Sequence, residues 1–126
     1  MSFIAHDSLI CPIDGLALLL EDNSLFCSNG HQYDIGKPGY VNLLSVQHKR
    51  SKAPGDSKEM VRARTAFLSM GFYDPIAQHL ADIISAQKKS ELTIVDAGCG
   101  DGYYPEKIDS LTNTKLRLIG FDISKS

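Results

Sequence analysis

The sequence lacks several features that mark other classes of protein. It has no apolar run near the roughly 20 residues that a membrane helix needs. Its first seven residues have neither the basic start nor the apolar stretch of a secretory signal. Three cysteines in 126 residues are too few for a disulfide framework. We therefore expect a cytoplasmic protein of about one average domain in length.

Lys and Arg are absent from residues 1–36, which hold five acids. Residues 37–64 have the opposite balance, with seven basic residues against two acids, and residues 65–126 hold six basic and eight acidic residues. A local basic block indicates contact with a polyanion such as nucleic acid. A solvated linker explains the same charges, and charge alone leaves both interpretations open.

The acidic N-terminal part contains residues spaced as metal ligands. A Cys-x-x-Asp pair and a Cys-x-x-x-His pair flank two short apolar stretches, which a turn at Asp22-Asn23 would join as a hairpin. The hairpin would gather four ligands of a zinc site, in which a carboxylate is unusual because structural zinc sites favour Cys and His. A metal-free hairpin with two buried thiols is the alternative. The candidate ligands are Cys11, Asp14, Cys27 and His31.

Two glycines favour tight turns at these pairs, since Gly15 and Gly30 can adopt positive φ. A segment this small has little core of its own, and domains below about 40 residues usually need a metal or another staple. The metal site would therefore also be a condition for order in this module.

A polar, basic segment follows and is closed by Pro54-Gly55, which predicts a loop. Its cations suit contact with phosphate groups. We take Lys49, Arg50 and Lys52 as candidate RNA-binding residues.

Two helices are predicted next. Asp56 or Ser57 can cap a helix over residues 58–70, which Gly71 would end. Asp74 as N-cap with Pro75 in the first turn would start a second helix that runs to about residue 88.

A glycine-rich turn between two strand-like runs is the most specific feature of the sequence. The apolar run 92–95 leads into a carboxylate and three glycines, a helical segment follows, and the run 116–121 ends in another acid. Strand, glycine turn, helix, strand and acid form the start of a nucleotide-binding α/β unit. The candidate cofactor residues here are Asp96, Gly98, Gly100, Asp101, Gly102 and Asp122.

The spacing of the glycines indicates which cofactor this turn would hold. In a dinucleotide-binding turn the third glycine falls at the position of Tyr103, whereas here it comes one residue earlier, at Gly102. G-x-G-x-G after a strand ending in Asp is typical of S-adenosylmethionine-dependent methyltransferases, and NAD is the disfavoured alternative. Asp122 can accept hydrogen bonds from ribose hydroxyls. Asp96 can interact with the cationic methionine end.

Several longer runs carry a resemblance to a known family. The sequence is similar to the bacterial 23S rRNA (guanine-N1)-methyltransferases, from about Cys11 to Ser124. The runs that carry it are the Cys-Pro opening, His31-Gln32-Tyr33-Asp34, Gly39 to Leu44, Val46 to Lys52, Pro54-Gly55-Asp56, Ala66-Phe67-Leu68 and Asp96 to Tyr104.

This resemblance implies an N-terminal zinc module that recognises a 23S rRNA hairpin, and a methyltransferase domain that transfers a methyl group to N1 of a guanine. It implies zinc ligands at positions 11, 14, 27 and 31, cofactor contacts at Tyr73, Gly100, Asp101 and Asp122, and a homodimer. Asp14 departs from the Cys of the family pattern.

The resemblance also implies a longer protein than this sequence. Family members carry roughly as much again beyond Ser126, including the adenine pocket and the residues that act on guanine, so we expect a truncated form that is inactive alone and assign no catalytic residue. The fold expected is α/β: a zinc-ribbon-like β module (1–45), a basic loop (46–57) and the first β-α-β unit of a Rossmann-like methyltransferase domain (58–126). A non-catalytic zinc- and RNA-binding module is the alternative function.

Overall fold

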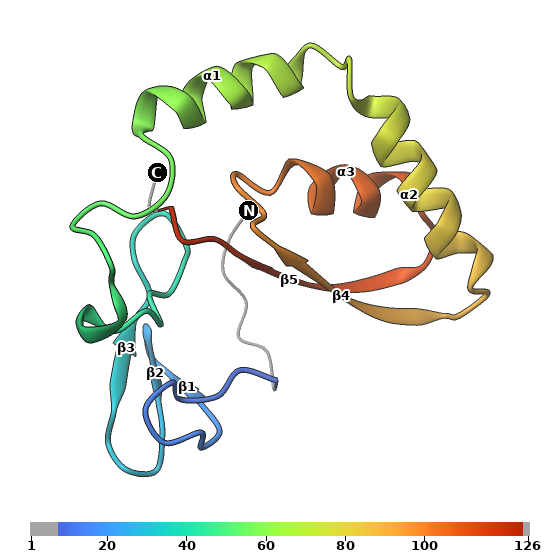
Figure 1. Ribbon diagram of the computed structural model, residues 1–126. Coiled ribbons are helices and arrows are strands. Elements are labelled where there is room, and N and C mark those ends of the chain that lie inside the picture. The colour runs from blue at the N-terminus through green and yellow to red at the C-terminus, as the bar shows by residue number, and fades with distance from the viewer. Residues whose placement is uncertain (1–7, 125–126) are drawn as a thin grey trace. The chain divides into compact units, whose positions relative to one another are not determined.

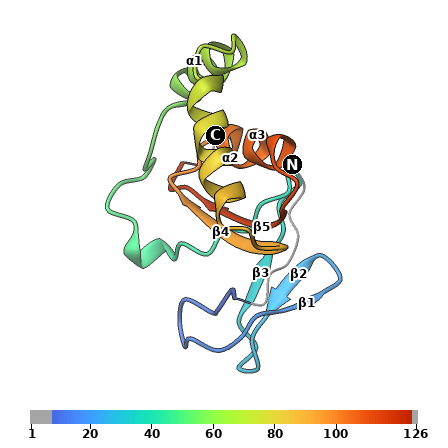
Figure 2. The same ribbon diagram turned by 90° about the vertical axis from the view of Figure 1, so that its right-hand side faces the viewer.

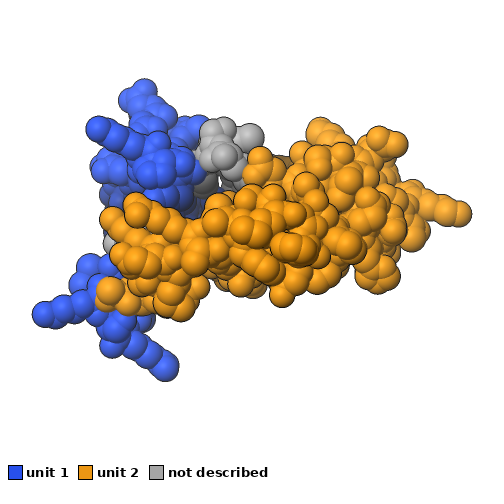
Figure 3. Space-filling model, turned by 90° about the horizontal axis from the view of Figure 1, so that it is seen from above, with its two compact units in different colours: residues 1–52 blue, residues 53–126 orange. Residues whose placement is uncertain are grey.

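The computed structural model describes residues 8–124 (Figure 1). The chain divides between Lys52 and Ala53 into two compact units, the first unit and the second unit (Figure 3). Over the described residues, no helix has the length and apolar character needed to cross a membrane.

The first unit is built on a small antiparallel sheet in the order β1-β2-β3. Strands β1 (Leu19–Glu21) and β2 (Ser24–Phe26) form the predicted hairpin, with Leu20 paired to Leu25 and the turn residue Asp22 at φ +52°. The third strand, β3 (Gln32–Asp34), pairs with β2. The sequence pattern predicts the hairpin but not this third strand.

The core of the first unit includes both of its cysteine side chains. Cys11, Leu18, Leu25 and Cys27 are buried, with Leu25 and Cys11 each only 1% exposed. Four partly buried side chains pack around them: Leu9, Tyr33, Val41 and Leu43. Two thiols thus occupy positions that apolar side chains would hold in a larger domain. A ligand bound by these thiols would therefore also affect the packing of the core.

The basic segment is irregular, as predicted, apart from one turn of 3-10 helix, η1 (Val46–His48). The second unit begins with α1 (Lys58–Ser69), where Ser57 acts as N-cap by accepting a hydrogen bond from the backbone N–H of Met60 at 3.2 Å. Gly71 follows the helix with φ +85°, the left-handed conformation expected at a helix end.

The second helix, α2 (Asp74–Ala86), starts one residue earlier than predicted, with Tyr73 rather than Asp74 as N-cap. The physical reason lies in the carboxylate of Asp74. It accepts a hydrogen bond from the hydroxyl of Tyr103 and forms an ion pair with Lys107 at 3.4 Å instead of capping its own helix.

The remaining elements form a parallel β-α-β unit, as the sequence predicts. Strands β4 (Glu91–Ala97) and β5 (Lys115–Phe121) pair in parallel, and α3 (Tyr103–Leu111) connects them, with Pro105 in its first turn. Figures 1 and 2 show α2 and α3 on one face of this pair. Alternate residues of β4 are accordingly half-buried and exposed, so the sheet has one covered face and one open face.

Candidate metal centre and cofactor turn

Two tight turns carry the four candidate metal ligands. In the first, the backbone N–H of Gly15 donates to the carbonyl of Cys11 at 2.8 Å, and Gly15 has φ +74°. In the second, the N–H of Gly30 donates to the carbonyl of Cys27 at 3.0 Å, and Gly30 has φ +83°. Both glycines thus have the positive φ that their positions predicted.

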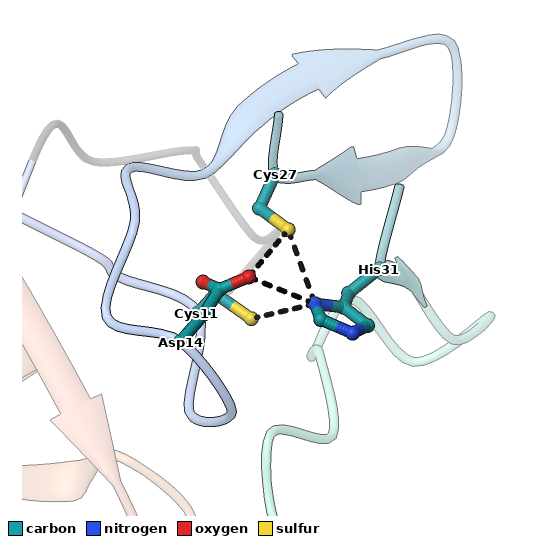
Figure 4. A group of neighbouring side chains, drawn as sticks. All are labelled: Cys11, Asp14, Cys27 and His31. Carbon is teal, nitrogen blue, oxygen red and sulfur yellow. Dashed lines mark hydrogen bonds and ion pairs between the residues drawn. The ribbon is translucent and has the colours of Figure 1, made fainter. Parts of the chain in front are cut away.

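The structure brings all four predicted ligands together (Figure 4). One ligand atom from each of them lies within 4.8 Å of the other three. The ring nitrogen Nδ1 of His31 faces the cluster, 3.6 Å from Cys11 Sγ, 3.3 Å from Cys27 Sγ and 3.0 Å from Asp14 Oδ2. Cys27 Sγ lies 3.4 Å from the same carboxylate oxygen.

These distances fit a tetrahedral zinc site. Ligand atoms at usual zinc distances and tetrahedral angles stand about 3.3 to 3.8 Å from one another. Four of the six separations run from 3.0 to 3.6 Å and all six lie within 4.8 Å, so small shifts of the side chains would admit the ion. Two thiols, an imidazole and a carboxylate are all accepted zinc ligands, and the donor set therefore suits this metal.

Hydrogen bonds around the cluster favour the charged form of two ligands. A backbone hydrogen bond from Leu16 and a side-chain hydrogen bond from Asn29 hold the pKa of Asp14 well below its usual range. Burial raises the pKa of Cys11, but hydrogen bonds from the Tyr33 hydroxyl and from backbone N–H groups outweigh burial, so the pKa is lowered. Both groups are thereby prepared to bind a cation.

The pKa values of Cys27 and Tyr33 are instead raised. Burial raises the pKa of Cys27, and the neighbouring carboxylate of Asp14 adds to the rise. The hydrogen bond to Cys11, 3.1 Å from hydroxyl to Sγ, raises the pKa of Tyr33 to about 12. Tyr33 can thus donate a hydrogen bond to the sulfur of Cys11.

The cofactor turn lies in the second unit, between β4 and α3. Gly98, Gly100 and Gly102 all have positive φ, at +75°, +57° and +85°. Asp122, directly after β5, accepts a hydrogen bond from the backbone N–H of Gly100 at 2.9 Å. The acid and the glycine turn therefore meet at the carboxyl edge of the parallel pair, where α/β sheets bind ligands.

Open space borders this turn. A Cβ atom added at Gly98 or Gly100 would meet nothing within 4 Å, so a ligand can approach the backbone closely there. Gly120 is different, because a Cβ at that position would stand 2.9 Å from the Cys99 sulfur. The turn thus has an open side at Gly98 and Gly100.

The other predicted cofactor residues make fewer contacts with the glycine turn. Asp101 accepts a hydrogen bond from the Thr65 hydroxyl at 2.7 Å, and half-buried Asp96 lies near the end of β4. The ring of Tyr73 packs edge-on against Phe67, with centroids 5.3 Å apart. Over residues 8–124, no hydrogen bond joins Tyr73 to the glycine turn.

Of the candidate RNA-binding residues, Arg50 and Lys52 are exposed and Lys49 is half-buried. Three supporting residues were not predicted from the sequence: Tyr33 and Asn29 beside the metal cluster, and Thr65 beside the glycine turn. Asn29 lies inside the Cys-x-x-x-His pair, and this position was the only signal that could have indicated it. Thr65 offered none, because 36 residues separate it from its partner.

Comparison with known proteins finds a match for the metal-binding module and relatives for most of the chain. Residues 9–52 match the family model described as "RlmA, N-terminal", a zinc ribbon. The chain is 35% identical over 102 residues to a 23S rRNA (guanine(748)-N(1))-methyltransferase of Streptomyces fradiae, with 79% of this chain covered. It is 33% identical over 135 residues, with 93% covered, to a protein of Micromonospora griseorubida named as a putative enzyme of the same type.

A third relative, named putative 23S rRNA (guanine-N(1)-)-methyltransferase YxjB, of Bacillus subtilis (strain 168), is 35% identical over 122 residues, with 91% of this chain covered. The chain spans between 35% and 44% of the length of these three relatives. It thus carries an RlmA-type N-terminal zinc ribbon and is homologous, over most of its own length, to the N-terminal part of the 23S rRNA (guanine-N1)-methyltransferases.

Proposed function

We propose that this chain forms part of an S-adenosylmethionine-dependent methyltransferase that acts on N1 of a guanine in 23S rRNA. The observation that carries the proposal is the contact between Asp122 and the N–H of Gly100, which joins acid and turn in one site at the strand ends. The names of three relatives supply the reaction and the substrate.

The first unit would recognise RNA. A zinc ion held by Cys11, Asp14, Cys27 and His31 would fix the two ligand-bearing turns, and so order a module with few buried side chains. The exposed cations Arg50 and Lys52, with Lys49, would contact the phosphates of an rRNA hairpin.

The second unit would hold one side of the cofactor, whose sulfonium methyl group is the group to be transferred. Asp122 would accept hydrogen bonds from the ribose hydroxyls, and the backbone at Gly98 and Gly100 would border the methionine part. The carboxylate of Asp96 would attract the cationic methionine end of the cofactor. None of these residues provides a base for guanine, so the catalytic residue stays unassigned.

Binding of S-adenosylmethionine to the purified chain tests the cofactor assignment by isothermal titration. We expect binding of S-adenosylmethionine and none of NAD. Asp122→Asn should weaken binding by roughly 10-fold or more, because hydrogen bonds to charged groups contribute about 1.5–3 kcal/mol. Asp109→Asn, an exposed position of α3, is the matched control. Equal affinity for NAD would overturn the assignment.

Binding of a 23S rRNA hairpin tests the other part of the proposal. Arg50 and Lys52 changed together to Ala should weaken binding and lower the slope of log affinity against log salt by about 0.7–0.9 for each lost phosphate contact. Lys88 and Lys89 changed to Ala remove the same charge from the second unit as a control. RNA binding without S-adenosylmethionine binding would instead favour the alternative, a zinc- and RNA-binding module.

A further inference from the structure

Asp14 is held by two hydrogen bonds from outside the ligand set. The backbone N–H of Leu16 donates to Oδ1 at 3.0 Å, and the side-chain amide of Asn29 donates to Oδ2, also at 3.0 Å. Oδ2 is the oxygen that faces Cys27 and His31. The two donors therefore fix how the carboxylate is turned.

This orientation decides which oxygen is available to a metal. Leu16 engages Oδ1, which leaves Oδ2 as the single ligand atom. An oxygen with two lone pairs can accept from Asn29 and still face the cluster. Donors of this kind orient metal-bound carboxylates, and their loss typically costs 10- to 100-fold in metal affinity.

Asn29 comes from the other ligand-bearing turn. It lies between Cys27 and His31, so the second pair of ligands supports a ligand of the first pair across the site. A thiolate at position 14, as in a usual Cys-x-x-Cys pair, would present no carboxylate oxygen to this amide. A thiolate sulfur accepts a hydrogen bond more weakly, so the support from Asn29 favours an aspartate ligand.

We propose that Asn29 is a positioning residue that adapts this zinc site to its carboxylate ligand, by holding Oδ2 of Asp14 toward the metal. The inference rests on the proposed zinc site. It assigns a function to Asn29 that a general turn-forming role would not require, since Asn is also common in turns for local reasons.

A double-mutant cycle on the full chain separates these roles. Cobalt(II) is titrated into the wild type, Asn29→Ala, Asp14→Cys and the double variant, and the thiolate-to-metal and d–d absorption bands report occupancy and ligand set. Ser28→Ala, an exposed change in the same turn, is the matched control. Competition with zinc then gives relative zinc affinities.

We expect Asn29→Ala to weaken cobalt binding about 10-fold or more in the wild-type background and to shift the d–d bands. In the Asp14→Cys background the same change should alter affinity by less than about twofold, because the coupled partner is gone. Ser28→Ala should change neither background. The Asp14→Cys background also shows whether the turn still folds with Ala at position 29.

Two results would overturn the inference. Equal weakening in both backgrounds would show that Asn29 merely supports the turn, and no weakening in the wild type would show that the carboxylate needs no such support. Failure of the zinc site itself appears elsewhere in the cycle, as absence of cobalt bands in the wild type. That result would also exclude Asp14 as a ligand, while the S-adenosylmethionine titration of the second unit would be unaffected.

Discussion

The two units bury their cores in different ways. Among residues 8–52 the buried apolar side chains are two cysteines and two leucines, and both cysteines belong to the metal cluster. In residues 53–126 the buried side chains come from helices and include Leu68, Ala77, Ala81 and Ile108. The first unit therefore joins core and ligand site in one place, whereas the second keeps its cofactor turn apart from its core.

This difference predicts how each unit depends on a ligand. A small module with few buried side chains relies on its metal for folding free energy. The second unit has helices packed on one face of its strands, but the other face leaves Val95 58% exposed, although parallel strands are normally covered on both faces. Loss of the metal should therefore damage the first unit alone.

The largest expected effect follows from removing the metal. Chelation of the zinc-loaded chain, or Cys27→Ser, should abolish cobalt and zinc binding and unfold residues 9–52, since structural zinc binding is itself folding free energy. Amide hydrogen exchange should show loss of protection in β2 and retained protection in β4 and β5. Cys99→Ser, outside the cluster, is the control. Equal loss of protection in both units would contradict the comparison.

A core substitution should have the next largest effect. Leu25 is 1% exposed, and Leu25→Ala should destabilise the metal-loaded first unit by about 2–5 kcal/mol. Leu19 in the neighbouring strand is 71% exposed, so Leu19→Ala is a matched control that should cost little.

Chemical denaturation followed by cobalt absorbance measures both leucine variants, because the bands disappear when the first unit unfolds. Similar losses for Leu25→Ala and Leu19→Ala would mean that the module has no defined core. A small loss for both would mean that the metal alone holds it.

Local patterns predicted the ligand-bearing part of the fold well. The Cys and His spacings, the hairpin turn and the glycines at the two ligand pairs (Gly15 after the first, Gly30 within the second) are all short-range signals, and each corresponds to a local turn in the structure. The glycine turn and the parallel strands were equally predictable from the sequence, because the strand, the glycines and the next strand follow one another in the chain.

Contacts between residues that lie far apart in the sequence could not be predicted from local patterns. The prediction of Asp74 as N-cap of α2 was wrong. Tyr103, 29 residues further on, donates a hydrogen bond to the carboxylate that would have capped the helix. The joining of β3 to the sheet and the contact of Thr65 with Asp101 depend in the same way on tertiary packing. Local propensity does not encode such partners.

The smallest expected effect concerns the link between α2 and α3. The hydrogen bond from Tyr103, and then the nearby Lys107, lower the pKa of Asp74. A carboxyl group with a lowered pKa stabilises the folded state at pH values above its unfolded pKa of about 3.9, and this contribution is lost as pH falls through the folded pKa. The stabilisation is modest because the side chain is 40% exposed.

Asp74→Asn should therefore lower the thermal transition of the second unit slightly at pH 7, and its deficit relative to the wild type should disappear as pH falls below about 4. Calorimetry across this pH range measures the deficit. In a Tyr103→Phe background, which lacks the main donor, Asp74→Asn should have a smaller effect at pH 7. A deficit that is constant with pH would show that Asn disturbs the helix start rather than the charge network, and would leave packing alone as the link between α2 and α3.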